Sequence, residues 1–287
     1  MATAKASITR AAAGTRLPPL SCVLAIGGLD PGGGAGVLAD ARAIARAGAF
    51  PCAAVAVLTV QSTSGLRGAT PVERRELLAE CTEVVRNQRV RAIKVGALGT
   101  DENTRAIADF LAIHRDVPAV VDTVMLPTRG RARLLDERAV ASLRDRVVPR
   151  AALVTVNAPE AEVLTGQRVT RLDEAEDAVR SLLALGARAV LLKGGHLGGP
   201  EAVDLLGLAG MTRVVLLRAP RLSLGPFHGG GCILASLIAG RLAATAEARR
   251  KASGSAIVAA VRWAKKIHHA ALRRTRDVGG DLRILLV

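Results

Sequence analysis

Short, uniformly apolar runs recur along the chain and alternate with longer stretches that have the apolar spacing of helices. A strand with one solvent face alternates apolar and polar side chains, so runs without alternation predict strands buried on both faces. The alternation of such strands with helices predicts an α/β fold with a mostly parallel central sheet. The runs lie at residues 22–28, 52–60, 91–98, 118–124, 152–157, 189–195 and 213–220.

Helical patterns fill the intervals between these runs, and glycines stand where several of the helices are expected to end. The chain shows neither an internal repeat nor an interdomain linker, so we expect one domain over residues 21–275. A disordered leader over residues 1–20 and a tail over residues 276–287 flank it. The expected helices cover residues 34–48, 71–88, 102–115, 136–147, 158–165, 173–186, 229–245 and 254–273.

The leader is rich in Ala and Arg and contains no acid, a composition that organellar transit peptides share. The same richness in Ala and Arg extends through the whole chain, so a disordered leader is the preferred interpretation. Four cysteines, far apart in the sequence, form neither a C-x-x-C pair nor a cluster with zinc-ligand spacing. Free thiols in a reducing cytoplasm fit this spacing best. These cysteines are Cys22, Cys52, Cys81 and Cys232.

The net charge of +15 is concentrated near the end of the chain, where residues 241–287 hold eleven Lys and Arg against three acids. Such a segment could attract nucleic acid, an acidic partner or anionic lipid. Aromatic residues make up only 1% of the chain and Tyr is absent, so surfaces that stack unpaired bases are not expected. We therefore expect a solvated, Arg-rich surface rather than a nucleic-acid partner. No apolar stretch approaches the roughly 20 residues that a membrane span needs.

A glycine-dense turn follows the first predicted strand, within GGLDPGGGAGVLAD at residues 27–40. Glycine lets backbone approach a ligand closely, and residues 34–39 match G-x-G-x-x-A. A dinucleotide site would also need an acid after the second strand, where this chain has Gln61. A nicotinamide-dependent enzyme is therefore disfavoured. The pattern G-x-x-x-x-G-K-[ST] is absent, which excludes a P-loop.

Asp40 lies in the helix that leaves this turn, among apolar and basic residues. Either it is an exposed helical acid that pairs with Arg42 or Arg46, or it faces a ligand and accepts hydrogen bonds. The sequence pattern alone favours neither interpretation.

Polar residues also follow two later strands, where ligands bind in open parallel sheets. Asn157 and Glu160 have the spacing of a capping box at a helix start, which is the plainer interpretation. The same carboxylate could serve a Mg²⁺–phosphate site through bound water. Lys193 ends a buried strand, an unfavourable place for an ammonium group unless an anion meets it.

The segment HGGGCILASLIAG, residues 228–240, places three glycines before a cysteine and an apolar helix. Gly229, Gly230 and Gly231 expose backbone N–H groups at the positive end of that helix, which predicts a hole for a phosphate or similar anion. Cys232 would have a lowered pKa there and provide a thiolate able to accept a proton. The alternative is a small buried cysteine that begins a core helix.

In this order, the motifs resemble those of the ribokinase-like superfamily, and within it the hydroxymethylpyrimidine/phosphomethylpyrimidine kinases of thiamine biosynthesis. The resemblance spans about residues 22–272 and implies a three-layer αβα sandwich with a mostly parallel central sheet. It also implies transfer of a phosphoryl group from ATP, with Mg²⁺, to a hydroxymethyl or phosphomethyl group on a pyrimidine. The motifs are AIGGLDPGGGAGVLADARA, VLTVQSTSG, IKVGALG, VVDTVM, VNAPEAEVLTG, LLKGGHL and HGGGCILASLIAGRLA.

The resemblance further implies roles for single residues. Asp40 and Gln61, with backbone near Gly28, would hold the pyrimidine. The three glycines at residues 229–231 would form the anion hole, and Cys232 would be the catalytic base.

On the phosphate side, Asn157, Glu160 and Lys193 would bind ATP, and Asp122 and Glu160 would serve the metal. The family resemblance also implies a homodimer.

The chain departs from the family pattern mainly on the acceptor side. Gly230 stands where the family has Thr in G-T-G-C, and the segment around residues 129–131 is Arg-Gly-Arg instead of Ser-Gly-Asp. A kinase of another hydroxymethyl heterocycle such as pyridoxal is therefore an alternative. A further alternative is a non-catalytic ligand-binding or regulatory protein that contacts nucleic acid through its basic segment. Other departures are Leu29, Leu38, Ala97, Thr123 and Phe227.

Overall fold

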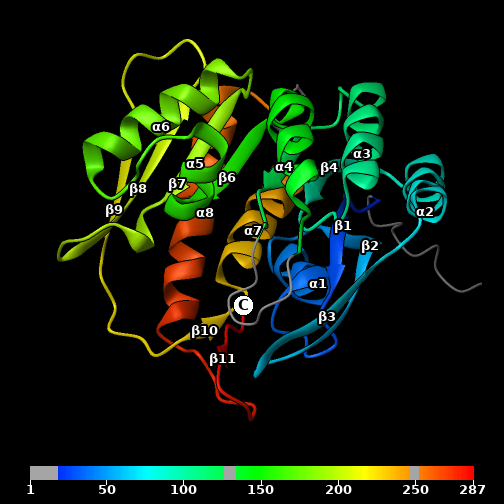
Figure 1. Ribbon diagram of the computed structural model, residues 1–287, viewed down its shortest axis with the longest axis horizontal. Helices are drawn as coiled ribbons and strands as arrows, with labels where there is room; N and C mark the ends of the chain where they lie inside the picture. Colours follow the sequence, from blue (N-terminus) through cyan, green and yellow to red (C-terminus); the bar gives the residue numbers. More distant parts are fainter. Residues whose placement is uncertain (1–18, 126–133, 246–251) are drawn as a thin grey trace, which may run out of the picture.

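The computed structural model describes residues 19–125, 134–245 and 252–287, and within these ranges nine strands form one central sheet (Figure 1). The strand order is β3-β2-β1-β4-β5-β6-β7-β8-β9. Neighbours from β2 to β7 pair in parallel, whereas β3, β8 and β9 join through antiparallel pairs. The strands are β1 Cys22–Leu29, β2 Phe50–Ser62, β3 Gly65–Pro71, β4 Val90–Val95, β5 Ala119–Asp122, β6 Leu153–Asn157, β7 Ala189–Lys193, β8 Glu201–Leu208 and β9 Val215–Pro220.

Helices cover both faces of this sheet, which confirms the predicted three-layer architecture. Helices α1, α7 and α8 pack on one face, and α2, α3, α4, α5 and α6 contribute to the core on the other. The helices are α1 Gly36–Arg46, α2 Arg74–Asn87, α3 Asp101–Ile113, α4 Glu137–Ser142, α5 Ala158–Thr165, α6 Leu172–Ala184, α7 Gly230–Ala244 and α8 Gly254–Leu272. A π-turn, Leu143–Val147, and a 3-10 turn, Val148–Arg150, continue α4, and a second 3-10 turn, Gly194–His196, follows β7.

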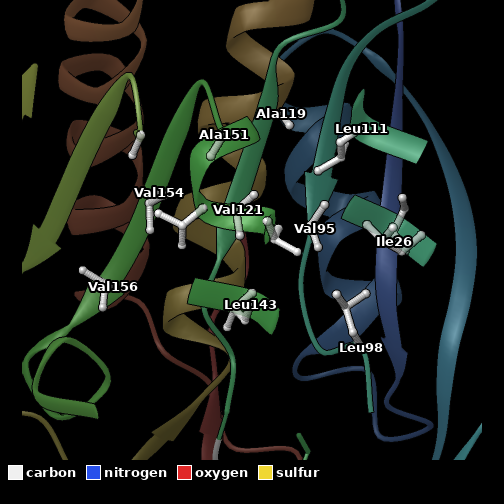
Figure 2. Packing of buried hydrophobic residues seen from close by; sticks show 14 of the residues in the cluster. Ile26, Val95, Leu98, Leu111, Ala119, Val121, Leu143, Ala151, Val154 and Val156 are labelled. Carbon is white, nitrogen blue, oxygen red and sulfur yellow. The ribbon is translucent and has the colours of Figure 1, made fainter. Parts of the chain in front are cut away.

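Each face of the sheet has its own apolar core, because successive side chains of a strand point to opposite faces. On β1, for example, Leu24 and Ile26 belong to one core and Val23 and Ala25 to the other. Figure 2 shows Ile26 beside residues of β4, β5 and β6 in the first of these cores. The apolar runs that form β1, β4, β5, β6 and β7 are therefore strands covered on both sides. The same prediction is wrong for β2, where Leu58 and Val60 are exposed, and for β9, which is only partly buried.

Two strands of the sheet, β3 and β8, were not predicted from the sequence. The β3 segment GLRGATP contains two glycines and a proline, residues that are depleted in strands. The β8 segment follows β7 after a short glycine-rich turn, because an antiparallel neighbour needs no crossover helix. It therefore lacks the preceding helix that marks most of the predicted strands in the sequence. The mostly parallel sheet predicted from the sequence is nevertheless confirmed.

A small second sheet lies at the end of the molecule where α7 begins (Figure 1). It pairs β10, Phe227–His228, in parallel with β11, Arg283–Ile284. Thus part of the segment expected as a tail, residues 276–287, contacts the loop that leads into α7. The predicted leader lies almost wholly outside the described residues, as do Arg129 and Arg131. No helix in the described ranges combines the length and the hydropathy needed to cross a membrane.

Gly240 sets how closely α7 packs on α1. A Cβ atom there would lie 2.6 Å from Ala47 Cβ and 3.1 Å from Ile44 Cα, so the helices touch through the glycine. We expect Gly240→Ala to lower the free energy of unfolding by about 1–3 kcal/mol through overpacking, although alanine alone favours a helix. Urea unfolding measures this change. Gly254→Ala is the control, because its Cβ would meet only Leu208 at 3.4 Å; equal stability of the two variants would contradict the packing argument.

Candidate active site

A pocket lies at the carboxyl edge of the parallel strands, where open α/β sheets bind ligands. Its walls come from the turn after β1, the ends of β2, β4, β5, β6 and β7, and the start of α7. Every predicted site residue except Asp40 lines it. The lining residues are Gly28, Asp30, Ala35, Gly36, Thr59, Gln61, Lys94, Ala97, Asp122, Val124, Leu134, Asn157, Glu160, Lys193, His228, Gly229, Gly230, Gly231 and Cys232.

The glycine loop at the start of α7 forms one wall. Gly229 has φ +81°, and a Cβ at this position would collide with Gly34 O, so only glycine fits there. The first turn of a helix leaves its amides without intrahelical acceptors, and the first such bond here runs from Ile233 N to Gly229 O at 3.0 Å. The amides of Gly230, Gly231 and Cys232 therefore lie at the positive end of α7, beside the pocket.

Lys193 and two carboxylates face this loop. Lys193 Nζ lies 2.9 Å from Asp122 Oδ1 and 4.0 Å from Glu160 Oε2, and a Cβ on Gly231 would lie 3.1 Å from the same Nζ. Burial opposes the charge on Asp122, but Lys193 and Lys94 outweigh it and hold the pKa of Asp122 below its usual value. Burial raises the pKa of Glu160, which Lys193 only partly offsets. The positive lysine thus lies where an anion at the glycine loop would bind.

The capping box predicted at the start of α5 is present. Asn157 Oδ1 accepts a hydrogen bond from Glu160 N, and Glu160 Oε2 accepts one from Asn157 N, both at 2.9 Å. Thr123 Oγ1 also donates to Glu160 Oε2, at 3.1 Å. Both side chains of the box line the pocket as well, so the structural and the ligand-binding interpretations of this pair are compatible.

The family resemblance implies a Mg²⁺ ion, and the carboxylates fit one that is held partly by water and phosphates. Among the described residues, Asp122 Oδ2 and Glu160 Oε1 accept no hydrogen bond, so each carboxylate keeps one oxygen available. Mg²⁺ commonly uses one or two carboxylates together with substrate phosphates. The described residues contain no group of three or more His, Cys, Asp or Glu that would form an all-protein cage.

Lys94, which the sequence analysis overlooked, is fully buried behind the pocket and lines its inner end. Its Nζ lies 2.7 Å from Asp40 Oδ2, and Ser236 Oγ donates to Asp40 Oδ1 at 2.7 Å. Burial opposes the charge on Lys94, but Asp40 outweighs it and raises the pKa of Lys94 above its usual value. The one signal in the sequence was a lysine inside the apolar run RAIKVGAL.

Asp40 has no exposed surface and contacts neither Arg42 nor Arg46. The interpretation of Asp40 as an exposed helical acid is therefore wrong. Arg42 instead donates to Gly33 O. Asp40 does not line the pocket and is linked to it by its contact with Lys94. A direct hydrogen bond between Asp40 and a ligand stays a prediction.

The expected lowered pKa of Cys232 is wrong for this structure. Burial raises the pKa of the thiol to about 12, and Asp122 and Asp40 add to the shift, although Lys94 and Lys193 oppose it. Burial and the two carboxylates outweigh the two lysines. Near neutral pH the Cys232 side chain is thus a thiol that faces the pocket between two lysines.

A buried chain of hydrogen bonds joins the first turn to the glycine loop. Asp30 accepts from Gly32 N and Ala35 N, each at 2.9 Å, and lies 2.9 Å from His228 Nε2. His228 Nε2 also lies 2.8 Å from Gln61 Nε2. Asp30 and His228 were not among the predicted site residues, yet they position Gln61 and both loops at one end of the pocket.

The wall beside Gln61 is apolar. Leu66, Ala97 and Leu134 form a small cluster, with Val124 packed against it. Apolar walls with a few directed polar groups suit a small ring-shaped ligand. This end of the pocket suits a small ring-shaped ligand, and the end at Lys193 and the glycine loop suits an anion.

Comparison with known families gives a match over residues 30–283 to the family model described as phosphomethylpyrimidine kinase. The hydroxymethylpyrimidine/phosphomethylpyrimidine kinase of Streptomyces coelicolor is 37% identical over 265 residues, 92% of this chain and 93% of that protein. The thiamine biosynthesis bifunctional protein ThiED of Geobacter sulfurreducens is 37% identical over 262 residues, 91% of this chain. The chain spans about half of that protein's length, 51%.

Two solved structures share the fold. The phosphomethylpyrimidine kinase of Clostridium difficile 630 superposes with a TM-score of 0.73 at 29% identity, over 88% of this chain and 99% of that chain. The pyridoxal kinase of Bacillus subtilis, solved as an ADP complex, has a TM-score of 0.81 at 24% identity, over 93% of this chain and 97% of that chain. The similarity to the pyridoxal kinase shows only a shared fold.

The buried Lys94–Asp40 pair makes a prediction about stability. Lys94→Met leaves the Asp40 carboxylate buried without its cation, so we expect the free energy of unfolding to fall by about 3–5 kcal/mol. The double variant Lys94→Met/Asp40→Leu should recover most of this loss, because both charges are then removed. Urea unfolding of both variants, with Lys266→Met at the surface as control, measures the effect. A loss below about 1 kcal/mol in Lys94→Met would show that the pair is not needed.

Proposed function

The chain belongs to the phosphomethylpyrimidine kinase family, and we propose that its pocket phosphorylates 4-amino-5-hydroxymethyl-2-methylpyrimidine, its monophosphate, or both, for thiamine biosynthesis. The phosphoryl donor in this proposal is ATP. One observation carries the proposal: the amides of residues 230–232, the Lys193 ammonium and the Cys232 thiol converge on a single pocket. In phosphoryl transfer, catalysis is mostly positioning and stabilisation of charge, which such a set of groups can supply.

On the phosphate side, Lys193 and the amides of the glycine loop would hold the transferred phosphoryl group and its neighbour. Asp122 and Glu160 would hold Mg²⁺ through their available oxygens, and Asn157 would lie beside the same phosphates. When bound, the metal neutralises phosphate charge that the protein alone meets with Lys193 and the helix terminus. The Lys193–Asp122 contact at 2.9 Å fixes the ammonium in place before ATP binds.

On the acceptor side, Gln61 and backbone near Gly28 would bind the polar edge of the pyrimidine ring. Ala97, Leu134 and Val124, which line the pocket, would cover one face of the ring and exclude water. Asp40 would contribute through Lys94, whose ammonium it holds at the inner end of the pocket. In this arrangement the acceptor oxygen faces Cys232.

Cys232, in its thiolate form, would take the proton from the acceptor oxygen as that oxygen bonds to the γ-phosphorus of ATP and ADP leaves, and the resulting thiol would then lose this proton to water. The products are the phosphorylated pyrimidine, ADP and one proton. Lys94 and Lys193 lower the cost of the thiolate, and burial and two carboxylates raise it. Because the thiol form dominates near neutral pH, a rate that depends on the Cys232 thiolate should rise as the pH is raised.

Three features expected from the sequence stay predictions at this stage: the homodimer, the cytoplasmic location and the use of Mg²⁺. Pyridoxal stays the alternative acceptor, and Ala97, a small residue beside the acceptor end, leaves space that could admit a bulkier ring.

We expect purified protein with Mg²⁺ and ATP to form ADP when hydroxymethylpyrimidine or its monophosphate is added, and to form none above background without an acceptor. Chelation of Mg²⁺ should abolish turnover, because the phosphate charge would lack its counterion. A coupled ADP assay with the two pyrimidines and pyridoxal side by side measures this. Turnover with pyridoxal alone would select the alternative acceptor, and pyrimidine binding without ADP would select a non-catalytic role.

The raised pKa of Cys232, about 12, predicts how kcat depends on pH. Below that pKa the thiolate fraction grows tenfold per pH unit, so we expect kcat to rise about tenfold per unit, which is about 100-fold between pH 7 and 9. Cys232→Ala should lower kcat about 10²-fold at pH 8 and remove the slope. Cys81→Ala is the matched control: burial raises the pKa of Cys81 to about 12 as well, but Cys81 lies outside the pocket. An unchanged slope in Cys232→Ala would refute the base assignment.

A further inference from the structure

His268 on α8 contacts the glycine loop from outside the pocket. Its Nε2 lies 2.9 Å from Gly230 O, and α8 packs beside α7 within the same core. His268 does not line the pocket, so it would not touch a ligand there. It is the one side chain in the described part of the molecule that hydrogen-bonds the backbone of residues 229–231.

The chemistry of the bond fixes the state of the imidazole. A carbonyl oxygen only accepts hydrogen bonds, so Nε2 must carry the proton and donate it. Burial lowers the pKa of His268 to about 4, which leaves the ring neutral near pH 7. His268 is therefore a neutral donor with one defined tautomer rather than a charge beside the pocket.

The geometry of the peptide bond carries the effect of His268 into the pocket. Gly230 C=O and Gly231 N–H belong to one planar peptide group, and the described residues include no cis peptide, so the two point in opposite directions. A donor that holds the carbonyl on the far side thereby aims the Gly231 amide at the near side. Gly231 lines the pocket, and the Lys193 ammonium and Asp122 lie 3.1 and 3.7 Å from a Cβ placed on this residue.

The loop needs such a restraint because consecutive glycines have few conformational limits of their own. Gly230 has no side chain to anchor it, and a Cβ at that position would lie 2.5 Å from Phe227 Cε2. The Phe227 ring thus occupies the space next to Gly230, and His268 supplies the hydrogen bond to its backbone. Together they contact the loop at Gly230.

The same face of α8 restrains the loop after β7. Lys265, one turn before His268, pairs with Asp204 Oδ2, and Asp204 Oδ1 accepts a hydrogen bond from Gly194 N at 2.9 Å. Gly194 directly follows Lys193 in the chain. One helix face therefore fixes both the glycine loop and the strand end that carries the lysine.

We propose that His268 is a positioning residue for phosphoryl transfer: by donating to Gly230 O, it orients the Gly231 amide toward the migrating phosphoryl group. This inference rests on the proposed kinase function. The Gly231 amide would bind the phosphoryl group most strongly in the transition state, when negative charge develops on it. Loss of its orientation should therefore raise the barrier of the chemical step more than it weakens binding of either substrate. The predicted deficit is therefore in kcat.

The test compares His268→Leu with His268→Gln, whose side-chain amide can donate to the same carbonyl. We expect His268→Leu to lower kcat about tenfold or more and to leave both KM values within about twofold. His268→Gln should recover most of kcat. His269→Leu, the neighbouring histidine without a contact to the loop, is the matched control and should keep kcat. If the leucine variant unfolds, His268→Asn, too short to reach the carbonyl, replaces it.

A second measurement does not depend on turnover. Hydrogen exchange of the amides of residues 230–232 should be faster in His268→Leu than in the unmodified chain and in His269→Leu. Unchanged kcat in His268→Leu, equal loss in the Leu and Gln variants, or unchanged exchange would each overturn the inference. Absence of kinase activity in the unmodified chain would instead reject the proposed function, and faster exchange in His268→Leu would still support the restraint on the loop.

Discussion

The arrangement of the pocket depends on the need to pair charges that are buried. Lys94, Asp40 and Asp122 have essentially no exposed surface, and the Lys193 side chain is 15% exposed. An unpaired charge in such a place costs several kcal/mol, so the elements that carry these residues must meet in one register. Helices α1 and α7 and strands β4, β5 and β7 are thereby held together around the same point. The elements that carry these paired charges are thus the elements that form the pocket.

The parallel sheet makes this possible because it brings the ends of distant segments to one edge. In the register of the sheet Asp122 lies opposite Thr155, and Asn157 opposite Lys193, although these residues are far apart in the sequence. Helix α7 then places its positive end against that edge. The topology thus places a helix terminus that attracts anions at the pocket, and in the proposed function the side chains at the other end would decide which acceptor ring is bound.

Much of the fold and the phosphate end of the pocket could be predicted from the sequence, because uniform apolar runs and glycine-rich turns are local signals. Contacts between residues that are distant in the sequence could not be predicted. Lys94 is a single basic residue in a predicted strand, and its partner Asp40 belongs to a helix elsewhere in the sequence, so no local pattern indicates the pair. The pKa of Cys232 depends on how fully the thiol is buried and on two carboxylates from other elements, whereas the sequence showed only the helix terminus. His268 contacts the glycine loop because of how α8 crosses α7, which no spacing rule reports.

The short pairing of β10 with β11 has a consequence for the order of events during synthesis on the ribosome. Arg283 N donates to Pro226 O, and Leu282 N donates to Thr63 O, so residues near 283 contact both the segment leading into the glycine loop and the β2–β3 turn. Contacts this distant in sequence form late. A nascent chain can assemble the sheet well before residue 283 emerges, but the β2–β3 turn and the segment that leads into the glycine loop then lack these contacts. Binding of substrate should consequently be among the last properties that the growing polypeptide acquires.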